Sequence, residues 1–207
     1  MIQISSQFDS GNIEVIDARD PQNIRLRIRR DSQSDFFQWF HFRLHDVRGE
    51  ALCLVIENAG EASYAGGFEG YHCAASYDRE TWFRLPDTAY DGRSLTIRFT
   101  PERDTVWLAY FEPYSQERHL DFIARCAASS QARVDRIGTS LQGRDIDRVR
   151  IGEGSHPVWI QARQQPGETM AEWFMEGLIE RLIDPADPIA REARRLGCFH
   201  LVANINP

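Results

Sequence analysis

The stretch Ala162-Arg163-Gln164-Gln165-Pro166-Gly167-Glu168-Thr169 decides how the second half of this chain folds. An apolar run at 157–162 precedes it and a helical pattern follows it, so it is a loop between a buried strand and a helix. Thr169 and Glu172 match a capping box, which predicts that the helix begins just after Glu168. The dipeptide Asp184-Pro185 ends the helix, because the residue before a proline avoids helical backbone angles.

The helix after this loop has an apolar stripe, and a second buried strand follows it. We expect the stripe to face the core; it consists of Met170, Trp173, Phe174, Gly177, Leu178 and Leu182. A short helix near 189–196 then leads to a strand at 199–203. Because strand, helix and strand follow one another, we expect a parallel pair joined by a right-handed crossover.

The first part of the chain, residues 1–115, has the pattern of an antiparallel β-sandwich. Residues 24–29 alternate strictly between apolar and charged side chains, as a half-buried strand does. A strand is also expected at 36–44, with Phe36, Phe40, Phe42 and Leu44 on its buried face. Turn signals separate further short strands, which we place at 51–56, 71–76, 82–84, 95–99 and 106–110.

The pattern changes near Ser115, which is a plausible helix cap. The segment after it is expected to form a helix whose buried face carries Leu120, Ile123, Ala124 and Ala127. Residues 132–138 and 144–151 then read as a hairpin around Gln142-Gly143. We therefore predict two domains, a β-sandwich at 1–115 and an α/β domain with a mixed sheet at 116–207.

Composition excludes several classes of function. The net charge of −7 argues against a nucleic-acid surface, which needs clustered basic residues. No apolar run approaches the roughly 18 residues of a membrane helix. The amino terminus lacks the features of a secretory signal, so we expect a cytoplasmic protein. The scattered cysteines are expected to be small buried hydrophobic residues in a reducing compartment; they are Cys53, Cys73, Cys126 and Cys198.

Together these motifs resemble the zinc metallocarboxypeptidases, in particular their cytosolic-carboxypeptidase-like branch, in which a β-sandwich precedes the catalytic domain. The matching segments span nearly the whole chain; they are Trp39-Phe40-His41-Phe42, residues 110–115, Gly138-Thr139-Ser140-Leu141-Gln142-Gly143-Arg144, residues 163–168 and Asn204-Ile205-Asn206-Pro207. The family's first metal-binding motif reads His-Pro-Gly-Glu. This chain has Gln165 where the family has the histidine.

The resemblance implies a zinc-dependent exopeptidase that removes carboxy-terminal residues from a peptide or protein substrate. Eukaryotic members of this branch trim glutamates from polypeptide tails. In the family, zinc is held by the histidine and glutamate of the first motif and by a second histidine further along. The metal activates a water molecule, a later glutamate is the general base, and arginine and asparagine residues hold the substrate carboxylate.

Transferred to this sequence, the resemblance assigns few residues. Glu168 matches the glutamate ligand, and Gln165 stands at the histidine position. Arg163 and Gln164 match the flanks of the motif, where they would support the ligands. The general base and the other catalytic groups have no counterpart before Pro207, so we expect a truncated catalytic domain that carries no catalytic residue of its own.

Two asparagines belong to the same predicted pocket. Asn204 and Asn206 follow the strand that is expected to pair in parallel with the strand before the loop. In parallel sheets ligands collect at the carboxyl ends of the strands, so both asparagines are expected on the substrate side of the site.

Other interpretations of these residues stay open. A glutamine offers only a neutral amide oxygen, a poor zinc ligand, so zinc binding is expected to be weak or absent. Glu168 is then a carboxylate stabilised by the dipole at the start of the next helix. His41 and His45 cannot share a zinc ion, because four residues of strand span about 13 Å.

A second function is a non-catalytic module that binds a protein partner, which Gln165 supports directly. We also expect self-association through the unpaired edge of a half-built sheet.

Overall fold

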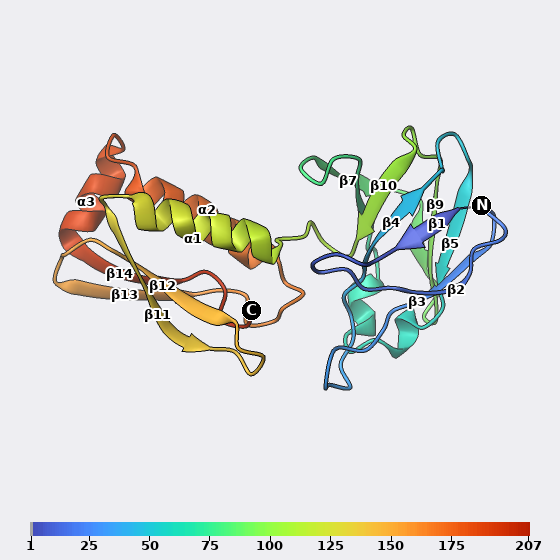
Figure 1. Cartoon of the computed structure of the whole chain (residues 1–207), viewed down its shortest axis with the longest axis horizontal. Helices are drawn as coiled ribbons and strands as arrows, with labels where there is room; N and C mark the ends of the chain where they lie inside the picture. Colours follow the sequence, from blue (N-terminus) through green and yellow to red (C-terminus); the bar gives the residue numbers. More distant parts are fainter. Residues whose placement is uncertain (1) are drawn as a thin grey trace. The chain divides into compact units, whose positions relative to one another are not determined.

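In a computed structural model, which describes residues 2–207, the chain divides into two compact units, one up to Pro113 and one from Tyr114 onward (Figure 1). The boundary expected from the sequence, after residue 115, lies just beyond this division. Throughout the described residues, every helix is too short or too polar to span a lipid bilayer.

The first unit contains two five-stranded sheets. In spatial order, one sheet consists of β1 (Gln3–Ser5), β4 (His41–His45), β10 (Thr105–Ala109), β6 (Cys73–Ser76) and β7 (Trp82–Leu85). The other consists of β2 (Glu14–Asp17), β3 (Ile24–Arg27), β5 (Leu52–Ile56), β9 (Leu95–Phe99) and β8 (Thr88–Tyr90). Two short 3-10 helices, η1 (Ala59–Glu61) and η2 (Ala65–Phe68), follow β5.

One apolar core joins the two sheets, which confirms the predicted sandwich. Ile24 and Leu26 of β3 are fully buried between arginines, as their alternation predicts. They share the core with Phe42 and Leu44 of β4 in the opposite sheet. Pairing is antiparallel except between β3 and β5, which run parallel.

The strand expected at 36–44 is partly wrong. Phe40, Phe42 and Leu44 are buried as predicted, but β4 begins only at His41, and Phe36 is 73% exposed. The physical reason is a turn closed by a hydrogen bond from Asp31 N to Phe36 O at 2.9 Å, which interrupts the alternation.

The second unit is built on a four-stranded mixed sheet, in the order β11 (Ala132–Thr139), β12 (Asp145–Ile151), β14 (Gly197–Val202) and β13 (His156–Gln161). The predicted hairpin is confirmed as the antiparallel pair of β11 and β12. The predicted parallel pair is confirmed as β13 and β14, in register from His156 opposite Gly197 to Gln161 opposite Val202. The mixed sheet that the resemblance implied is therefore present.

Two helices cover one face of this sheet, as Figure 1 shows: α1 (Gln116–Ala128) and α2 (Met170–Ile183). A third, α3 (Pro188–Leu196), connects α2 to β14. Phe122 and Cys126 of α1 and Met175 and Ile179 of α2 pack against the sheet. The cap of α1 is confirmed, since the Ser115 hydroxyl accepts a hydrogen bond from Arg118 N.

The buried faces of both helices differ from those expected. On α1 the buried side chains are His119, Phe122 and Cys126, whereas Leu120 of the expected face is exposed. On α2 the expected residues Met170 and Phe174 are exposed, Phe174 by 60%. The buried residues of α2 are Glu172, Met175, Glu176, Ile179 and Leu182. Polar side chains can occupy the buried face of both helices because they form hydrogen bonds with other residues of the second unit, such as that between His119 and Glu172.

The four cysteines are free thiols. Cys73 and Cys126 are buried as expected, whereas Cys53 and Cys198 are only half-buried.

Candidate functional site

The loop at 162–168 lies at the carboxyl end of β13, beside the segment that leaves β14. Its base continues the parallel ladder, because Ala162 N donates to Val202 O at 3.0 Å and Ile205 N donates to Ala162 O at 3.1 Å. Inside the loop, Glu168 N donates to Gln165 O at 3.0 Å, so these two residues occupy one turn. The side chains of both are exposed to solvent.

The two predicted asparagines shape the neighbouring segment. Asn204 is buried, and its Oδ1 accepts a hydrogen bond from Asn206 N at 3.1 Å. Asn206 Nδ2 donates to Gln164 O at 3.1 Å and so joins this turn to the loop. The structure therefore brings the predicted site residues to one end of the parallel strand pair, with Asn206 in contact with the backbone of the loop.

Arg163 has a left-handed backbone, with φ of 57°. Its guanidinium has three acceptors: Nε donates to Pro166 O at 3.1 Å, and Nη1 donates to Tyr114 O at 2.9 Å and to Glu172 Oε2 at 2.5 Å. A non-glycine residue rarely adopts this conformation unless the surroundings hold it. Arg163 therefore supports the loop from its inner side, and its guanidinium is turned toward α2.

The acceptor on α2 is a fully buried carboxylate, which corrects the predicted capping box. Glu172 Oε1 lies 2.6 Å from His119 Nδ1 of α1, and Oε2 receives Arg163. Thr169 is the N-cap of α2 without a side-chain cap hydrogen bond. Glu172 does not reach back to the helix start because its side chain points inward to a histidine and an arginine.

One turn along α2, Glu176 is the centre of a second cluster. Tyr114 Oη donates to it at 2.6 Å, Arg118 donates through Nε and Nη2 at 2.9 and 3.0 Å, and Arg125 Nη2 donates at 2.7 Å. Burial favours the neutral acid, but the hydrogen bonds from Tyr114 and Arg118 and the charges of both arginines outweigh it, so the pKa of Glu176 is lowered. Burial and the adjacent carboxylate raise the pKa of Tyr114.

Zinc does not fit the donors that the described residues offer. Residues 2–207 contain no group of three or more histidine, cysteine, aspartate or glutamate side chains placed to hold a metal ion. The predicted donors are one carboxylate, Glu168, and the neutral amide of Gln165. A structural zinc site uses four protein ligands and a catalytic one three, so these two donors are too few.

The two histidines of β4 have separate environments. His41 is buried, with Nδ1 3.0 Å from Ser10 Oγ, whereas His45 Nδ1 lies 3.0 Å from Thr105 Oγ1. Burial, aided by the positive charge of Arg79, lowers the pKa of His41 to about 3. His41 is therefore a buried residue of the first unit, and among the described residues the two histidines have no partner in common.

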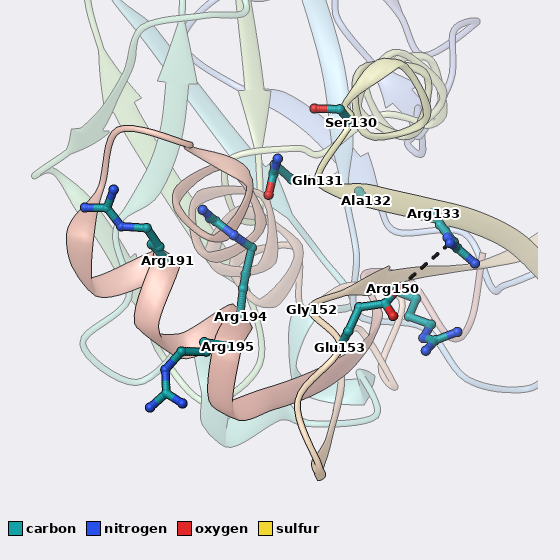
Figure 2. Close-up of a pocket in the computed structure, with 10 residues that line it drawn as sticks. All are labelled: Ser130, Gln131, Ala132, Arg133, Arg150, Gly152, Glu153, Arg191, Arg194 and Arg195. Atoms are coloured by element: carbon teal, nitrogen blue, oxygen red, sulfur yellow. Dashed lines mark ion pairs between the residues drawn. The ribbon is translucent and has the colours of Figure 1, made fainter.

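A hollow of about 330 Å³ lies at the other end of the second unit's sheet, between α3, the start of β11 and the loop after β12. Figure 2 shows that the side chains of Arg191, Arg194 and Arg195 on α3 point in different directions and do not meet at one point. Glu192 binds Arg195, and carbonyl oxygens at the end of α2 bind Arg194. Arg133 faces Glu153 at 3.9 Å. These contacts explain Arg133, Arg194 and Arg195 as helix-end and surface pairs, distinct from the predicted site.

Sequence reasoning missed the buried groups behind the loop, above all Glu172, His119 and Glu176. One signal was available: glutamates recur every four residues, at 172, 176 and 180, in a helix with many apolar side chains. Charged side chains are almost never fully buried unless they are paired, so this spacing could have prompted a search for cationic partners.

Comparisons with known proteins agree with the division of the chain into two units, up to Pro113 and from Tyr114 onward. Residues 4–111 match the family model of the cytosolic carboxypeptidase N-terminal domain, and residues 119–207 match that of zinc carboxypeptidases. An uncharacterized protein of Zymomonas mobilis is 46% identical over 206 residues, covering 100% of this chain and 54% of that protein. Human cytosolic carboxypeptidase 6 is 26% identical over 97% of this chain and 44% of its own length.

Solved structures are similar over the same extent. A metallo-carboxypeptidase from Burkholderia cenocepacia superposes with a TM-score of 0.96 at 45% identity, covering 100% of this chain and 56% of that one. A metallo-carboxypeptidase from Pseudomonas aeruginosa, solved in complex with (2-guanidinoethylmercapto)succinic acid, has a TM-score of 0.92 at 46% identity, covering 99% and 56%. The chain thus spans about half the length of the relatives it matches.

Proposed function

Because the chain belongs to the zinc metallocarboxypeptidase family, in its cytosolic-carboxypeptidase-like branch, we propose that it carries the first metal-binding loop of an enzyme that removes carboxy-terminal residues from peptides. One observation supports this most directly: Gln165 and Glu168 are exposed on a single turn at the carboxyl end of a parallel strand. Ligands collect at such strand ends in α/β sheets. The complete reaction is part of the proposal, since the chain spans about half of its relatives.

The polypeptide by itself is inactive under this proposal. Zinc would supply Lewis-acid activation of a water molecule when bound. Glu168 offers the carboxylate that the family uses. Gln165 offers an amide oxygen where the family has the imidazole nitrogen of a histidine. The other residues of the site act on the loop: Arg163 and Asn206 hold its backbone through Pro166 O and Gln164 O.

The test joins residues 1–207 to the carboxy-terminal part of the Pseudomonas aeruginosa metallo-carboxypeptidase, once with Gln165 and once with Gln165→His. The histidine fusion is expected to bind one zinc ion in calorimetry and to release carboxy-terminal residues from peptides. Replacing a residue that supports a metal ligand typically lowers activity by roughly 10–100-fold. Replacing the ligand itself should lower it more, so the glutamine fusion should be at least about 100-fold less active than the histidine fusion.

The peptides in this assay end in glutamate or in arginine. Glutamate is chosen because eukaryotic members of the branch trim glutamates. Arginine is chosen because the compound bound to the Pseudomonas aeruginosa relative carries a guanidino group, as arginine does. Rapid hydrolysis by the unfused 207-residue chain would refute its inactivity. A folded histidine fusion without any turnover would refute the proposed enzyme.

Gln165 favours a second candidate, a non-catalytic module that binds a protein partner. A histidine fusion that folds and binds zinc but leaves every peptide intact would favour this module over the enzyme.

Two further expectations belong to the proposal. The names of the cytosolic relatives support a cytoplasmic location. Self-association would use β13, which pairs with β14 on one side only and carries Trp159, 61% exposed. An exposed strand edge is a ready template for pairing. Light scattering that finds a monodisperse monomer at all concentrations would contradict self-association.

A further inference from the structure

A continuous chain of buried polar contacts connects the sheet of the second unit to the loop at 162–168. His119 Nε2 lies 3.7 Å from Asp147 Oδ2 of β12, and its Nδ1 lies 2.6 Å from Glu172 Oε1. The other oxygen of Glu172 receives Arg163. We propose that Glu172 is a positioning residue, which sets the conformation of the candidate metal loop by holding the guanidinium of Arg163.

The backbone of Arg163 explains why the loop needs this support. A left-handed conformation costs an L-amino acid roughly 1–2 kcal/mol, so contacts elsewhere must offset that cost. The Arg163 guanidinium supplies them, because it binds Pro166 O within the loop and Tyr114 O outside it. Both bonds require the guanidinium to stay where Glu172 holds it.

Glu172 is suited to this role because it is fully buried and bound through both of its oxygens. A buried carboxylate that loses a partner is strongly destabilising, so separating Arg163 from Glu172 is unfavourable. A charge-assisted hydrogen bond is also about twice as strong as a neutral one.

Glu176 provides the matched comparison. It lies one turn further along the same helix, is also buried, and also binds arginine, in its case Arg118 and Arg125. Its hydrogen-bond partners among the described residues are Tyr114, Arg118 and Arg125, which all lie outside residues 162–168. Neutralising Glu176 therefore perturbs α1 and α2 to a similar degree, and because glutamine can still accept the hydrogen bond of Tyr114, the bond from Arg163 to Tyr114 O stays in place.

Amide hydrogen exchange on the full 207-residue chain separates these effects. The reporters are the amides of Glu168 and Ile205, which donate to Gln165 O and Ala162 O. Relative to core amides of β14, Glu172→Gln is expected to speed exchange at both reporters at least tenfold. Glu176→Gln is expected to leave this ratio within twofold, because local opening of the loop does not involve it.

A second variant covers the case in which Glu172→Gln fails to fold. Arg163→Gln removes the same contact from the loop side and should give the same tenfold increase at both reporters. Unchanged reporter ratios in a folded Glu172→Gln or Arg163→Gln chain would overturn the proposal, as would equal ratios in the Glu172 and Glu176 variants. Identifying the loop with a metal site rests on the proposed function, but exchange requires neither zinc nor activity. A failed positioning role is therefore distinguishable from a failed enzyme.

Discussion

Neutralising Glu176 should destabilise the second unit by about 2–3 kcal/mol, and the structure gives the reasons. Glutamine keeps the size of the side chain and can still accept the hydrogen bond of Tyr114, but it loses the charge that binds Arg118 and Arg125. A hydrogen bond to a charged group contributes roughly 1.5–3 kcal/mol. Arg118 and Arg125 are 42% and 51% exposed, so water recovers part of that loss.

The assay is urea or thermal unfolding of wild type and Glu176→Gln at pH 7. In a unit of about 100 residues, 1 kcal/mol shifts the melting temperature by roughly 4–8 °C, so a decrease of about 10–20 °C is expected. Glu180→Gln is the matched control on the same helix. Glu180 is 53% exposed and pairs with Arg125 at 3.4 Å, and such surface pairs contribute about 0–1 kcal/mol.

The pH dependence gives an independent check with a definite sign. The pKa of Glu176 is lower in the folded chain than its ordinary value of 4.5. Its charge therefore stabilises the fold fully above pH 4.5, and this contribution disappears as the pH falls through the lower folded pKa. The difference between wild type and Glu176→Gln should shrink below pH 4.5. A cost within 0.5 kcal/mol of the Glu180→Gln cost at pH 7 would refute the reasoning (a threshold set by the roughly ±0.5 kcal/mol scatter of surface substitutions).

Three further predictions test the packing of both units. Ile179→Ala should lower the free energy of unfolding in urea by about 2–5 kcal/mol, whereas Phe174→Ala, at an exposed position, should lower it by less than about 1 kcal/mol. The reverse order would mean that Phe174 faces the core, as the sequence alone predicts. Gly177→Ala should raise the melting temperature, since a new Cβ meets nothing within 4 Å and alanine favours a helix by roughly 1 kcal/mol. Gly154→Ala should lower it sharply, since its Cβ would lie 2.0 Å from backbone. Because the pKa of buried His41 is lowered to about 3, the first unit should lose stability as the pH falls from 6.5 toward 3, and His41→Gln should flatten this slope in unfolding titrations.

The positions of several strands along the chain, one parallel strand pair and the place of the loop could be predicted from the sequence. Strict alternation at Ile24 and Leu26 has one structural solution, a half-buried strand, and the structure has β3 there. The loop at 162–168 was placed by a topological rule, because a strand, a helix and a second strand bring both strand ends to one edge. Such features depend on local pattern and chain order alone.

The buried faces of α1 and α2 could not be predicted in the same way. The rule that apolar side chains face inward selected Leu120 on α1 and Phe174 on α2, and both are exposed. The helices bury His119 and Glu172 instead, because these two residues, 53 positions apart in the chain, satisfy each other. A contact between residues so far apart in the chain depends on tertiary structure. The periodicity of side chains within one helix cannot predict it.

The buried pair of Arg163 and Glu172 indicates how the loop tolerates glutamine at position 165. Gln165 takes part in the loop through its backbone: its carbonyl accepts a hydrogen bond from Glu168 N at 3.0 Å, whereas its side chain is exposed to solvent. The shape of the loop is held from the inner side by Arg163 and Glu172. Under the proposed function, glutamine at 165 therefore lacks the metal donor of the family's histidine, while the support for the loop is unchanged. Gln165→His should accordingly change the free energy of unfolding by less than about 0.5 kcal/mol in the absence of metal. A larger loss would mean that the loop has adapted to glutamine, and the hypothesis of a binding module would then gain over that of an enzyme.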